Sequence, residues 1–226
     1  MPVIQHSASF KRLSASELAK WRGAESAAVS DCLNRAQAMD GGIQPLDVAM
    51  QVVGQARTVR CTVGDNSALQ AAIDLAEPGD ILVADAGGFM GNAIWGGLMT
   101  QAALRKGLSG LVIDGCIRDR REITASNFPC YARGSVPAGP HKNFGGQIDC
   151  PIACGGVAVC PGDLVVADGD GVTIVPLLQV ERVHLDYLAL KKKETRALSE
   201  LAEGGSLGSI YGVPEITRLE GNSNGR

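Results

Sequence analysis

The chain has 226 residues, which is enough for one large domain with a substantial buried core. Hydrophobic residues make up 45% and charged residues 20%, a composition typical of a folded globular protein and not of a disordered chain. With 24 acidic and 21 basic residues, the formal net charge is −3. This balance excludes the strongly basic surface that nucleic acids and anionic membranes attract, so we expect neither as a partner.

The number of cysteines indicates whether the protein works in a reducing or an oxidising compartment. The seven cysteines are an odd number, and the N-terminal residues do not form a signal-peptide pattern, so we expect reduced thiols in a cytoplasmic protein. Cys150 and Cys154 have no matching second pair, which favours buried structural thiols over a metal site. No apolar run approaches the ~18–20 residues that cross a bilayer.

Local patterns predict the elements in chain order. Residues 1–12 show no periodicity and are expected to form an arm. A capping box at Ser14-Ala15-Ser16-Glu17 predicts a short helix ending near Trp21, and the spacing of apolar residues predicts a second helix over residues 25–36. The later elements are a strand pattern over 48–63 with clear alternation from Ala56, a helix over 68–76 capped by Ser67, a strand over 81–84, a helix over 98–106, a strand over 111–114, a helix over 120–126, strands over 129–133, 151–154, 157–159, 164–167 and 172–176, and a long amphipathic helix over 178–203.

The order of these elements mixes short crossovers with hairpins, including a strong hairpin turn at Asp168-Gly169-Asp170-Gly171. It fits an α/β protein with parallel and antiparallel strands in more than one layer. No repeat or linker divides the chain, so we expect one domain. A polar tail is expected from Gly204 and a loose end beyond Gly221.

The stretch from Gly91 to Glu122 carries the strongest functional signal. A Gly-rich loop is expected over residues 87–97, followed by the helix over 98–106, which Gly107 ends. The next strand delivers Arg118 and Asp119 beyond its C-terminal end, where ligands enter α/β sheets. Backbone amides at the helix start and in an expected turn around Gly115 are positioned to face one small anion.

The chemistry of the Arg118-Asp119 pair allows two interpretations. Arginine offers a rigid fork that matches a carboxylate, and one aspartate suffices for Mg²⁺, which often binds through one or two carboxylates and keeps several waters. The alternative is an internal salt bridge at the strand end. Glu122, three residues later, is either a second, water-mediated metal partner or an ordinary carboxylate in a first helical turn.

Other candidates give weaker signals. Gly64-Asp65-Asn66 precedes a helix N-terminus, where free amides favour anions, but an ordinary turn has the same pattern. His141 and Lys142 lie in a Gly/Pro-rich segment and are expected to face solvent. The absence of H-E-x-x-H and G-x-S-x-G patterns removes the usual markers of zinc and serine hydrolases.

The pattern G-x20-R-D-x2-E runs from Gly97 through Arg118 and Asp119 to Glu122. Together with the surrounding VIDGCIRD, this pattern resembles the RraA-like family, which contains the 4-hydroxy-4-methyl-2-oxoglutarate/4-carboxy-4-hydroxy-2-oxoadipate aldolases and the regulator of RNase E activity. The resemblance spans roughly residues 25–205 of the single expected domain. Further matches are Gly64-Asp65-Asn66, Pro78-Gly79-Asp80, Pro161-Gly162-Asp163 and residues 167–172.

The resemblance implies a three-layer β/β/α swivelling-domain fold with mixed sheets, assembled as a homotrimer or a hexamer with sites between subunits. It implies a divalent cation, Mg²⁺ or Mn²⁺, held mainly by Asp119, while Arg118 contacts a 2-oxo acid. Glu194 of a neighbouring subunit's C-terminal helix, or Glu200 in a looser alignment, is implied to reach the site. The implied substrate-binding residues are Asn66, Gly96, Gly97, Leu98, Met99 and Arg118.

The implied function is metal-dependent cleavage of a C–C bond in a 2-oxo acid to give pyruvate, with Arg118, Asp119 and Glu122 as catalytic residues. Retro-aldol cleavage and oxaloacetate decarboxylation pass through the same enolate, so one site suits both. Aldolases of the family can carry Asp where this chain has Gly97, and Glu122 is expected to substitute for it in part. The alternatives are a protein-binding regulator of ribonuclease E-type activity and a catalytically silent oligomeric scaffold.

Overall fold

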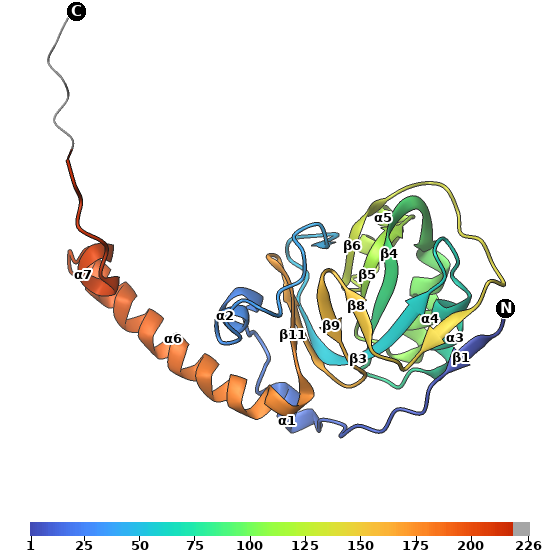
Figure 1. Ribbon diagram of the computed structural model, residues 1–226, viewed down its shortest axis with the longest axis horizontal. Coiled ribbons are helices and arrows are strands. Elements are labelled where there is room, and N and C mark those ends of the chain that lie inside the picture. The colour runs from blue at the N-terminus through green and yellow to red at the C-terminus, as the bar shows by residue number, and fades with distance from the viewer. Residues whose placement is uncertain (219–226) are drawn as a thin grey trace, which may run out of the picture. The chain divides into compact units, whose positions relative to one another are not determined.

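The computed structural model describes residues 1–218 as two compact units, Met1–Tyr187 and a second that begins at Leu188 (Figure 1). The first unit contains β1 (Val3–Gln5), α1 (Ala15–Ala19), α2 (Ser26–Asp31), β2 (Gln44–Pro45), β3 (Val52–Cys61), α3 (Ser67–Leu75), β4 (Ile81–Trp95), α4 (Gly97–Lys106), β5 (Gly110–Ile117), α5 (Arg120–Ala125), β6 (Cys130–Ser135), β7 (Gly146–Ile148), β8 (Ile152–Cys154), β9 (Val157–Val159), β10 (Leu164–Asp168), β11 (Gly171–Val175) and the short helix η1 (Leu177–Gln179). Helix α6 (Val180–Ala202) begins in the first unit and continues into the second, which also holds α7 (Leu207–Tyr211).

The main sheet is mixed. Its order is β1-β7-β3-β4-β5-β6-β2, and β10 and β11 continue it from the first half of β3. The central strands β3, β4, β5 and β6 are parallel neighbours, whereas β7, β2 and β10 join antiparallel. The expected combination of parallel and antiparallel strands is therefore confirmed.

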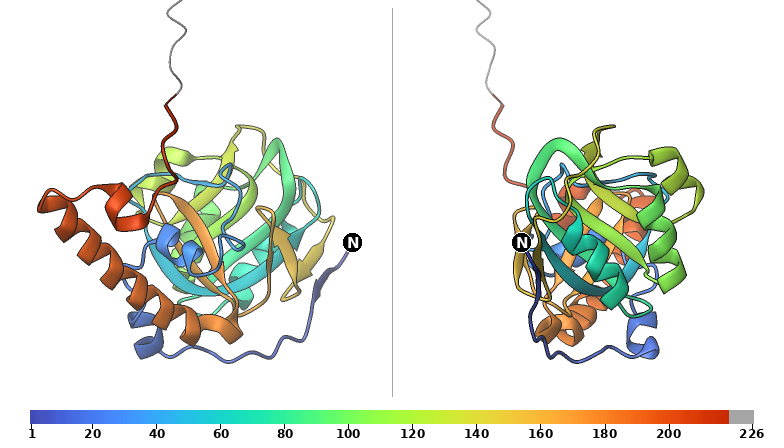
Figure 2. Two further views of the ribbon diagram at one scale, coloured as in Figure 1. Left: turned by 60° about the vertical axis from the view of Figure 1, so that its left-hand side comes forward. Right: turned by 90° about the vertical axis from the view of Figure 1, so that its right-hand side faces the viewer.

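Alternation of side chains along the central strands builds a three-layer core. Leu82 and Ala84 of β4 belong to an apolar cluster with residues of α3, α4 and α5, which lie on one face of the sheet (Figure 2). Ile81 and Val83 point the other way, into a cluster with residues of β8, β9, β10 and β11. Strands buried on both faces are continuous apolar runs because each alternate residue meets a different layer. The predicted β/β/α layering is confirmed.

The Gly-rich segment is not the loop that its composition predicts. Strand β4 runs through it from Ile81 to Trp95 and stays paired with β5, with register shifts after Asp85, Phe89 and Ala93. Positive φ angles at Gly87 and Gly88 introduce these irregularities without ending the pairing. Gly115 lies inside β5 opposite Phe89, so the expected turn with a second group of amides is also wrong.

Two helix boundaries differ from prediction for local backbone reasons. Helix α2 ends at Asp31, because Asn34 and Arg35 have left-handed φ angles of 54° and 63° that a helix cannot continue through. Helix α3 begins at Ser67 with Asn66 at the N-cap position, one residue earlier than predicted. The capping box of Ser14 and Glu17 is confirmed.

Five of the seven cysteines are buried, including Cys150 and Cys154. Burial raises the pKa of Cys130 to about 12 and raises that of Cys154 as well, so both remain neutral thiols. The predicted burial of Cys150 and Cys154 is confirmed.

The N-terminal arm is tied to the first unit by polar contacts. Its strand β1 pairs in parallel with β7, and the amide of Leu13 donates to Oε1 of Gln55 at 2.8 Å. Near its end, Arg12 forms an ion pair with Asp80, whose side chain is only 2% exposed. The ring of Phe10 packs directly against Gly162, where a Cβ atom would collide with it. The arm is therefore part of the folded unit and not a free extension.

Replacing Arg12 with alanine is expected to lower the free energy of unfolding by about 1.5–3 kcal/mol, because the buried Asp80 carboxylate loses a charged hydrogen bond. Arg57 remains 3.6 Å from Asp80 and compensates only in part. Urea unfolding measures the effect. Arg35→Ala is the matched control, since its ion pair with Asp31 is exposed and worth less than about 1 kcal/mol. Equal losses in the two variants would contradict the assignment.

The second unit is helical. The remainder of α6 carries an ion pair between Lys191 and Glu194 at 2.6 Å, and α7 starts with a capping box formed by Ser206 and Ser209. The long C-terminal helix is confirmed, apart from the separate turn η1 before it. The expectation for residues beyond Gly221 concerns a part of the chain outside residues 1–218. Across those described residues, no helix has the length and apolarity to span a membrane.

Candidate active site

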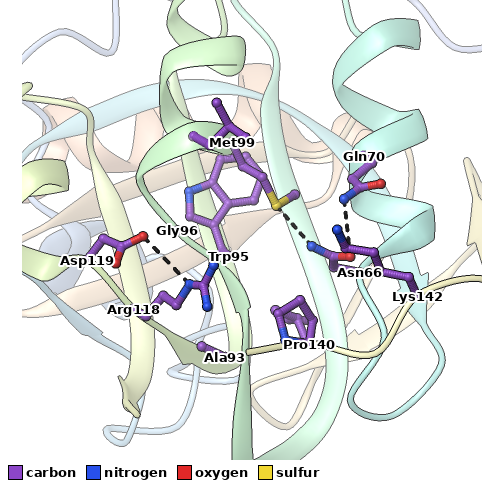
Figure 3. Close-up of a pocket in the computed structure, with 12 residues that line it drawn as sticks. Asn66, Gln70, Ala93, Trp95, Gly96, Met99, Arg118, Asp119, Pro140 and Lys142 are labelled. Carbon is purple, nitrogen blue, oxygen red and sulfur yellow. Dashed lines mark hydrogen bonds and ion pairs between the residues drawn. The ribbon is translucent and has the colours of Figure 1, made fainter. Parts of the chain in front are cut away.

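A small pocket lies where the parallel strands β4 and β5 end and α4 begins (Figure 3). Its volume is about 120 Å³, and part of it is open to solvent. The C-terminal ends of neighbouring parallel strands meet at one edge of a sheet, which is why residues from different elements converge there. The lining residues are Asn66, Gln70, Ala93, Ile94, Trp95, Gly96, Leu98, Met99, Arg118, Asp119, Pro140 and Lys142.

Asp119 has an unusual backbone for a residue other than glycine. Its φ angle is 60°, in the left-handed region, and it occupies the N-cap position of α5 without capping the helix through its side chain. That conformation has a cost that surrounding contacts must offset. One such contact is the amide of Gly97, which donates to Oδ2 of Asp119 at 2.9 Å. The carboxylate is thereby turned toward the start of α4.

Arg118 lies beside this carboxylate, with its Nε atom 3.7 Å from Oδ2 of Asp119. The separation is longer than a hydrogen bond, and the two side chains remain 46% and 42% exposed. The predicted alternative of an internal salt bridge is thus present only as a loose contact. Both charged groups keep most of their bonding capacity for a ligand.

Glu122 occupies the space directly above Gly97. A Cβ atom at Gly97 would lie 2.2 Å from Oε2 of Glu122, and one at Gly96 would lie 2.6 Å from Oδ2 of Asp119. Two carboxylates therefore close over two consecutive glycines. A side chain at either position would have to displace a carboxylate; at Gly97 that carboxylate is the end of the exposed Glu122 side chain, which is free to move aside. Neither Gly97 nor Glu122 lines the pocket itself, but both border Asp119, which does.

The start of α4 presents backbone amides near the same carboxylates. Gly97, Leu98 and Met99 form its first turn, where amides have no partner within the helix. The amide of Gly97 is used by Asp119, which leaves those of Leu98 and Met99 for a ligand. The turn is held by Trp95, whose Nε1 donates to Oγ1 of Thr100 at 2.8 Å, while that hydroxyl donates to the carbonyl of Gly96 at 3.2 Å.

The opposite wall carries neutral and cationic groups (Figure 3). Nδ2 of Asn66 lies 3.3 Å from Sδ of Met99, and Nε2 of Gln70 donates to Oδ1 of Asn66 at 3.3 Å. Lys142 lines this wall from the segment between β6 and β7. The pocket thus has Arg118 on one side and Lys142 on the other, with amide groups between them.

Sequence reasoning missed Gln70 and Lys142. Gln70 follows Asn66 by four residues, a spacing that places two side chains on the same side of a helix. The position of Gln70 is therefore predictable from that of Asn66. Lys142 is exposed, as expected, but it also faces the pocket. Its local sequence contains no signal for that contact, which depends on the hydrogen bond that joins the carbonyl of Ala138 to the amide of Ala93 in β4.

Residues 1–218 contain no cluster of three or more His, Cys, Asp or Glu side chains arranged to hold a metal ion. Glu194 and Glu200, the candidates for a contribution from a neighbouring subunit, belong to the second unit.

Fold and site together define a mixed α/β protein with a pocket at the ends of parallel strands, lined by Arg118, Asp119 and Lys142 and bordered by Glu122. The sequence matches the RraA-like family, described as aldolase/RraA, over residues 26–174. The chain belongs to this family.

Several relatives make the similarity more specific. A protein of Halalkalibacterium halodurans, named provisionally as a 4-hydroxy-4-methyl-2-oxoglutarate aldolase, is 43% identical over 166 residues, covering 74% of this chain and 79% of the relative. An uncharacterized protein from Pseudomonas syringae has a similar solved structure, with a TM-score of 0.79, 27% identity, and coverage of 91% of this chain and 97% of the other. The structure of the RNA-processing inhibitor RraA from Thermus thermophilis has a TM-score of 0.62 and 28% identity, covering 68% and 93%.

Proposed function

We propose that this protein is a divalent-metal-dependent lyase that cleaves a C–C bond of a 2-oxo acid and releases pyruvate. The observation that carries the proposal is the convergence of Arg118, Asp119 and the first-turn amides of α4 on one pocket. The similarity to relatives named provisionally as 4-hydroxy-4-methyl-2-oxoglutarate aldolases supports the same reaction class.

The residues at the site fit a hard divalent cation such as Mg²⁺ or Mn²⁺. Asp119 and Glu122 supply carboxylate oxygens on either side of Gly97, and Mg²⁺ commonly binds through one or two carboxylates while keeping several waters. Asp119 would be the main ligand and Glu122 a partner through water. A bound cation would supply positive charge that stabilises the enolate formed on cleavage.

The protein's own groups account for binding and orientation. The amides of Leu98 and Met99 would hold the carboxylate next to the 2-oxo group, and Arg118 would donate to the 2-oxo oxygen. When the bond between C3 and C4 breaks, its electron pair moves onto C3 and is delocalised to that oxygen, where the charge of Arg118 stabilises it. Protonation of C3 then gives pyruvate. The C4 side leaves as a carbonyl compound in retro-aldol cleavage, its hydroxyl proton passing to water, or as CO2 from oxaloacetate, and in both reactions C3 takes its proton from water.

The test is a pyruvate-release assay with oxaloacetate and with 4-hydroxy-4-methyl-2-oxoglutarate, in Mg²⁺, in Mn²⁺ and in EDTA. We expect release from at least one substrate with metal and its loss in EDTA. Absence of metal-dependent release from both substrates would overturn the proposal.

Lys142 is proposed to select substrates with a second carboxylate, because it lies across the pocket from Arg118. Lys142→Met is expected to raise KM for oxaloacetate about tenfold through loss of one charged hydrogen bond, with kcat little changed. Competitive inhibition by pyruvate, which has no second carboxylate, should change less than twofold. Lys106→Met, at the other end of α4, is the control and should leave both constants unchanged. A kcat effect without a KM effect would contradict the role.

We propose a homotrimer, or a pair of trimers, in which Glu194 of a neighbouring subunit's C-terminal helix approaches the pocket. Glu200 is the second candidate. Analytical ultracentrifugation tests the assembly. Mixing inactive Arg118→Ala and Glu194→Ala chains tests the shared site. In a mixed trimer, some sites would combine Arg118 of one chain with Glu194 of its neighbour, and these sites would regain activity.

A second candidate function is regulation of a ribonuclease through protein binding, favoured by the similarity to the RNA-processing inhibitor RraA. It predicts nuclease inhibition that survives loss of the Asp119 carboxylate. A pull-down with ribonuclease E and an RNA-cleavage assay with Asp119→Asn distinguish it from the lyase.

A further inference from the structure

Three separate segments form the wall of the pocket that faces away from Asp119. They are the end of β4, the turn that carries Asn66, and the segment from Ala138 to Lys142. The turn with Asn66 follows β3, whereas the segment from Ala138 to Lys142 lies between β6 and β7. The distance between these two segments is therefore not set by their local sequences. Lys142 ends the second of these segments, so its distance from Arg118 depends on the contacts that join the segment to β4 and to the turn with Asn66.

Asn92 of β4 joins all three segments. Its Nδ2 group donates to the carbonyl of Gly64 at 2.9 Å and to the carbonyl of Gly139 at 3.2 Å. Asn92 is 8% exposed. Its two acceptors, Gly64 and Gly139, lie one or two residues before the pocket residues Asn66 and Pro140 in the sequence. An amide nitrogen has two hydrogens, and here each is used on a different segment.

Backbone bonds complete the junction around this side chain. The amide of Ala93 donates to the carbonyl of Ala138 at 2.8 Å, and that of His141 donates to Gly64 at 2.8 Å. Gly64 has a φ angle of +76°, and a Cβ there would come within 3.0 Å of Oδ1 of Asn92. The turn is thus pressed against the Asn92 amide.

The chemistry at this junction requires a donor with two hydrogens. Aspartate is almost isosteric but would direct an anionic oxygen at two carbonyls. The Oδ1 atom of Asn92 is buried and has no hydrogen-bond partner within residues 1–218. Asparagine thus supplies hydrogens to two backbone carbonyls of different segments at once, which neither aspartate nor an apolar side chain could do.

We propose that Asn92 is a positioning residue that sets the span between Arg118 and Lys142 and thereby selects 2-oxo acids with a second carboxylate. The inference rests on the proposed function for the identity of the ligand. It concerns ligand length and makes no claim about the bond-breaking step, because Asn92 does not line the pocket.

The experiment measures binding by titration calorimetry with two probes, 2-oxoglutarate as a dicarboxylate that lacks a cleavable group and pyruvate as a monocarboxylate, both with Mg²⁺. Asn92→Ala is expected to raise Kd for 2-oxoglutarate about tenfold and Kd for pyruvate less than twofold. Lys142→Met should give a similar pattern. The double variant should be at most about twofold weaker than Lys142→Met alone, because residues that act through one another are not additive.

Two controls separate positioning from general destabilisation. Thr58→Val removes a buried hydrogen bond of 2.6 Å to the carbonyl of Cys150 in the same sheet and should lower stability without changing either Kd. Asn92→Ser keeps one donor and should restore part of the affinity if Asn92→Ala is too unstable to measure. Hydrogen exchange at the amides of His141 and Ala93 should be faster in Asn92→Ala than in the unsubstituted protein.

Equal weakening of both probes, full additivity with Lys142→Met, or no binding of 2-oxoglutarate by the unsubstituted protein would each overturn the inference. The expected binding pattern without any pyruvate release from cleavable substrates would refute the lyase reaction alone.

Discussion

Asp119→Asn is expected to lower kcat/KM for metal-dependent pyruvate release by at least about 10³-fold, equivalent to ~4 kcal/mol of transition-state stabilisation. Asparagine is nearly isosteric and tolerates the left-handed φ angle of 60° at this position, so the backbone of α5 should stay in place. It can still accept the hydrogen bond from the amide of Gly97. What changes is the negative charge that would hold a divalent cation.

Two measurements accompany that variant. Calorimetric titration with Mn²⁺ should show binding to the unsubstituted protein and none to Asp119→Asn, independently of any substrate. Asp74→Asn, on the exposed face of α3, is the matched control and should retain both binding and activity. Unchanged activity in Asp119→Asn would remove the central residue of the proposed mechanism.

Gly97→Asp is expected to be nearly inactive, although aldolases of the family can carry aspartate at this position. Gly97 begins α4 with ordinary helical backbone, so an L-residue is not strained there by its φ angle. The new Cβ would lie 2.2 Å from Oε2 of Glu122, so the exposed Glu122 side chain would have to leave its place beside Asp119, and the new carboxylate would repel it. Because the exposed Glu122 side chain can swing aside, we expect a loss of stability below about 1 kcal/mol, and we expect its displacement to lower activity about 100-fold or more.

Removing the Glu122 carboxylate should reverse the effect. The double variant Gly97→Asp/Glu122→Ala is expected to be more stable than Gly97→Asp and to recover activity above that of either single variant, since residue 97 then supplies the second carboxylate. Gly97→Ala/Glu122→Ala has the same space but no carboxylate and serves as the control. Thermal unfolding and pyruvate release follow both properties. A double variant as poor as Gly97→Asp would show that the two carboxylates do not exchange roles.

The layered fold was predictable because its signals are local. Alternating or continuous apolar runs define the central strands, and Gly107 ends α4 with a left-handed φ angle of 82°, as its position predicts. The Gly-rich segment was not predictable in the same way. Gly87 and Gly88 look like loop residues, yet pairing with β5 holds them in a strand with register shifts. The energy of strand pairing overrides local preference there, and no local pattern reports it.

The residues of the candidate site were likewise predictable from sequence only in part. Arg118 and Asp119 could be chosen from sequence because an apolar strand ends immediately before them, and strand ends are where ligands enter such sheets. Gln70 followed from Asn66 only by helical spacing. Lys142 and Asn92 gave no signal, because their roles depend on contacts between distant segments; the bonds from Asn92 to Gly64 and Gly139 span 28 and 47 residues.

By itself, the sequence determined the alternation of strands and helices, the buried thiols, and the placement of an arginine and an aspartate beyond a buried strand. These follow from side-chain chemistry and periodicity within short windows. Only the tertiary structure decided that Glu122 fills the space above Gly97, that Lys142 faces Arg118, and that Asn92 joins the segments between them. Those relations are distances across the fold, and they are set by strand pairing and packing rather than by neighbouring residues.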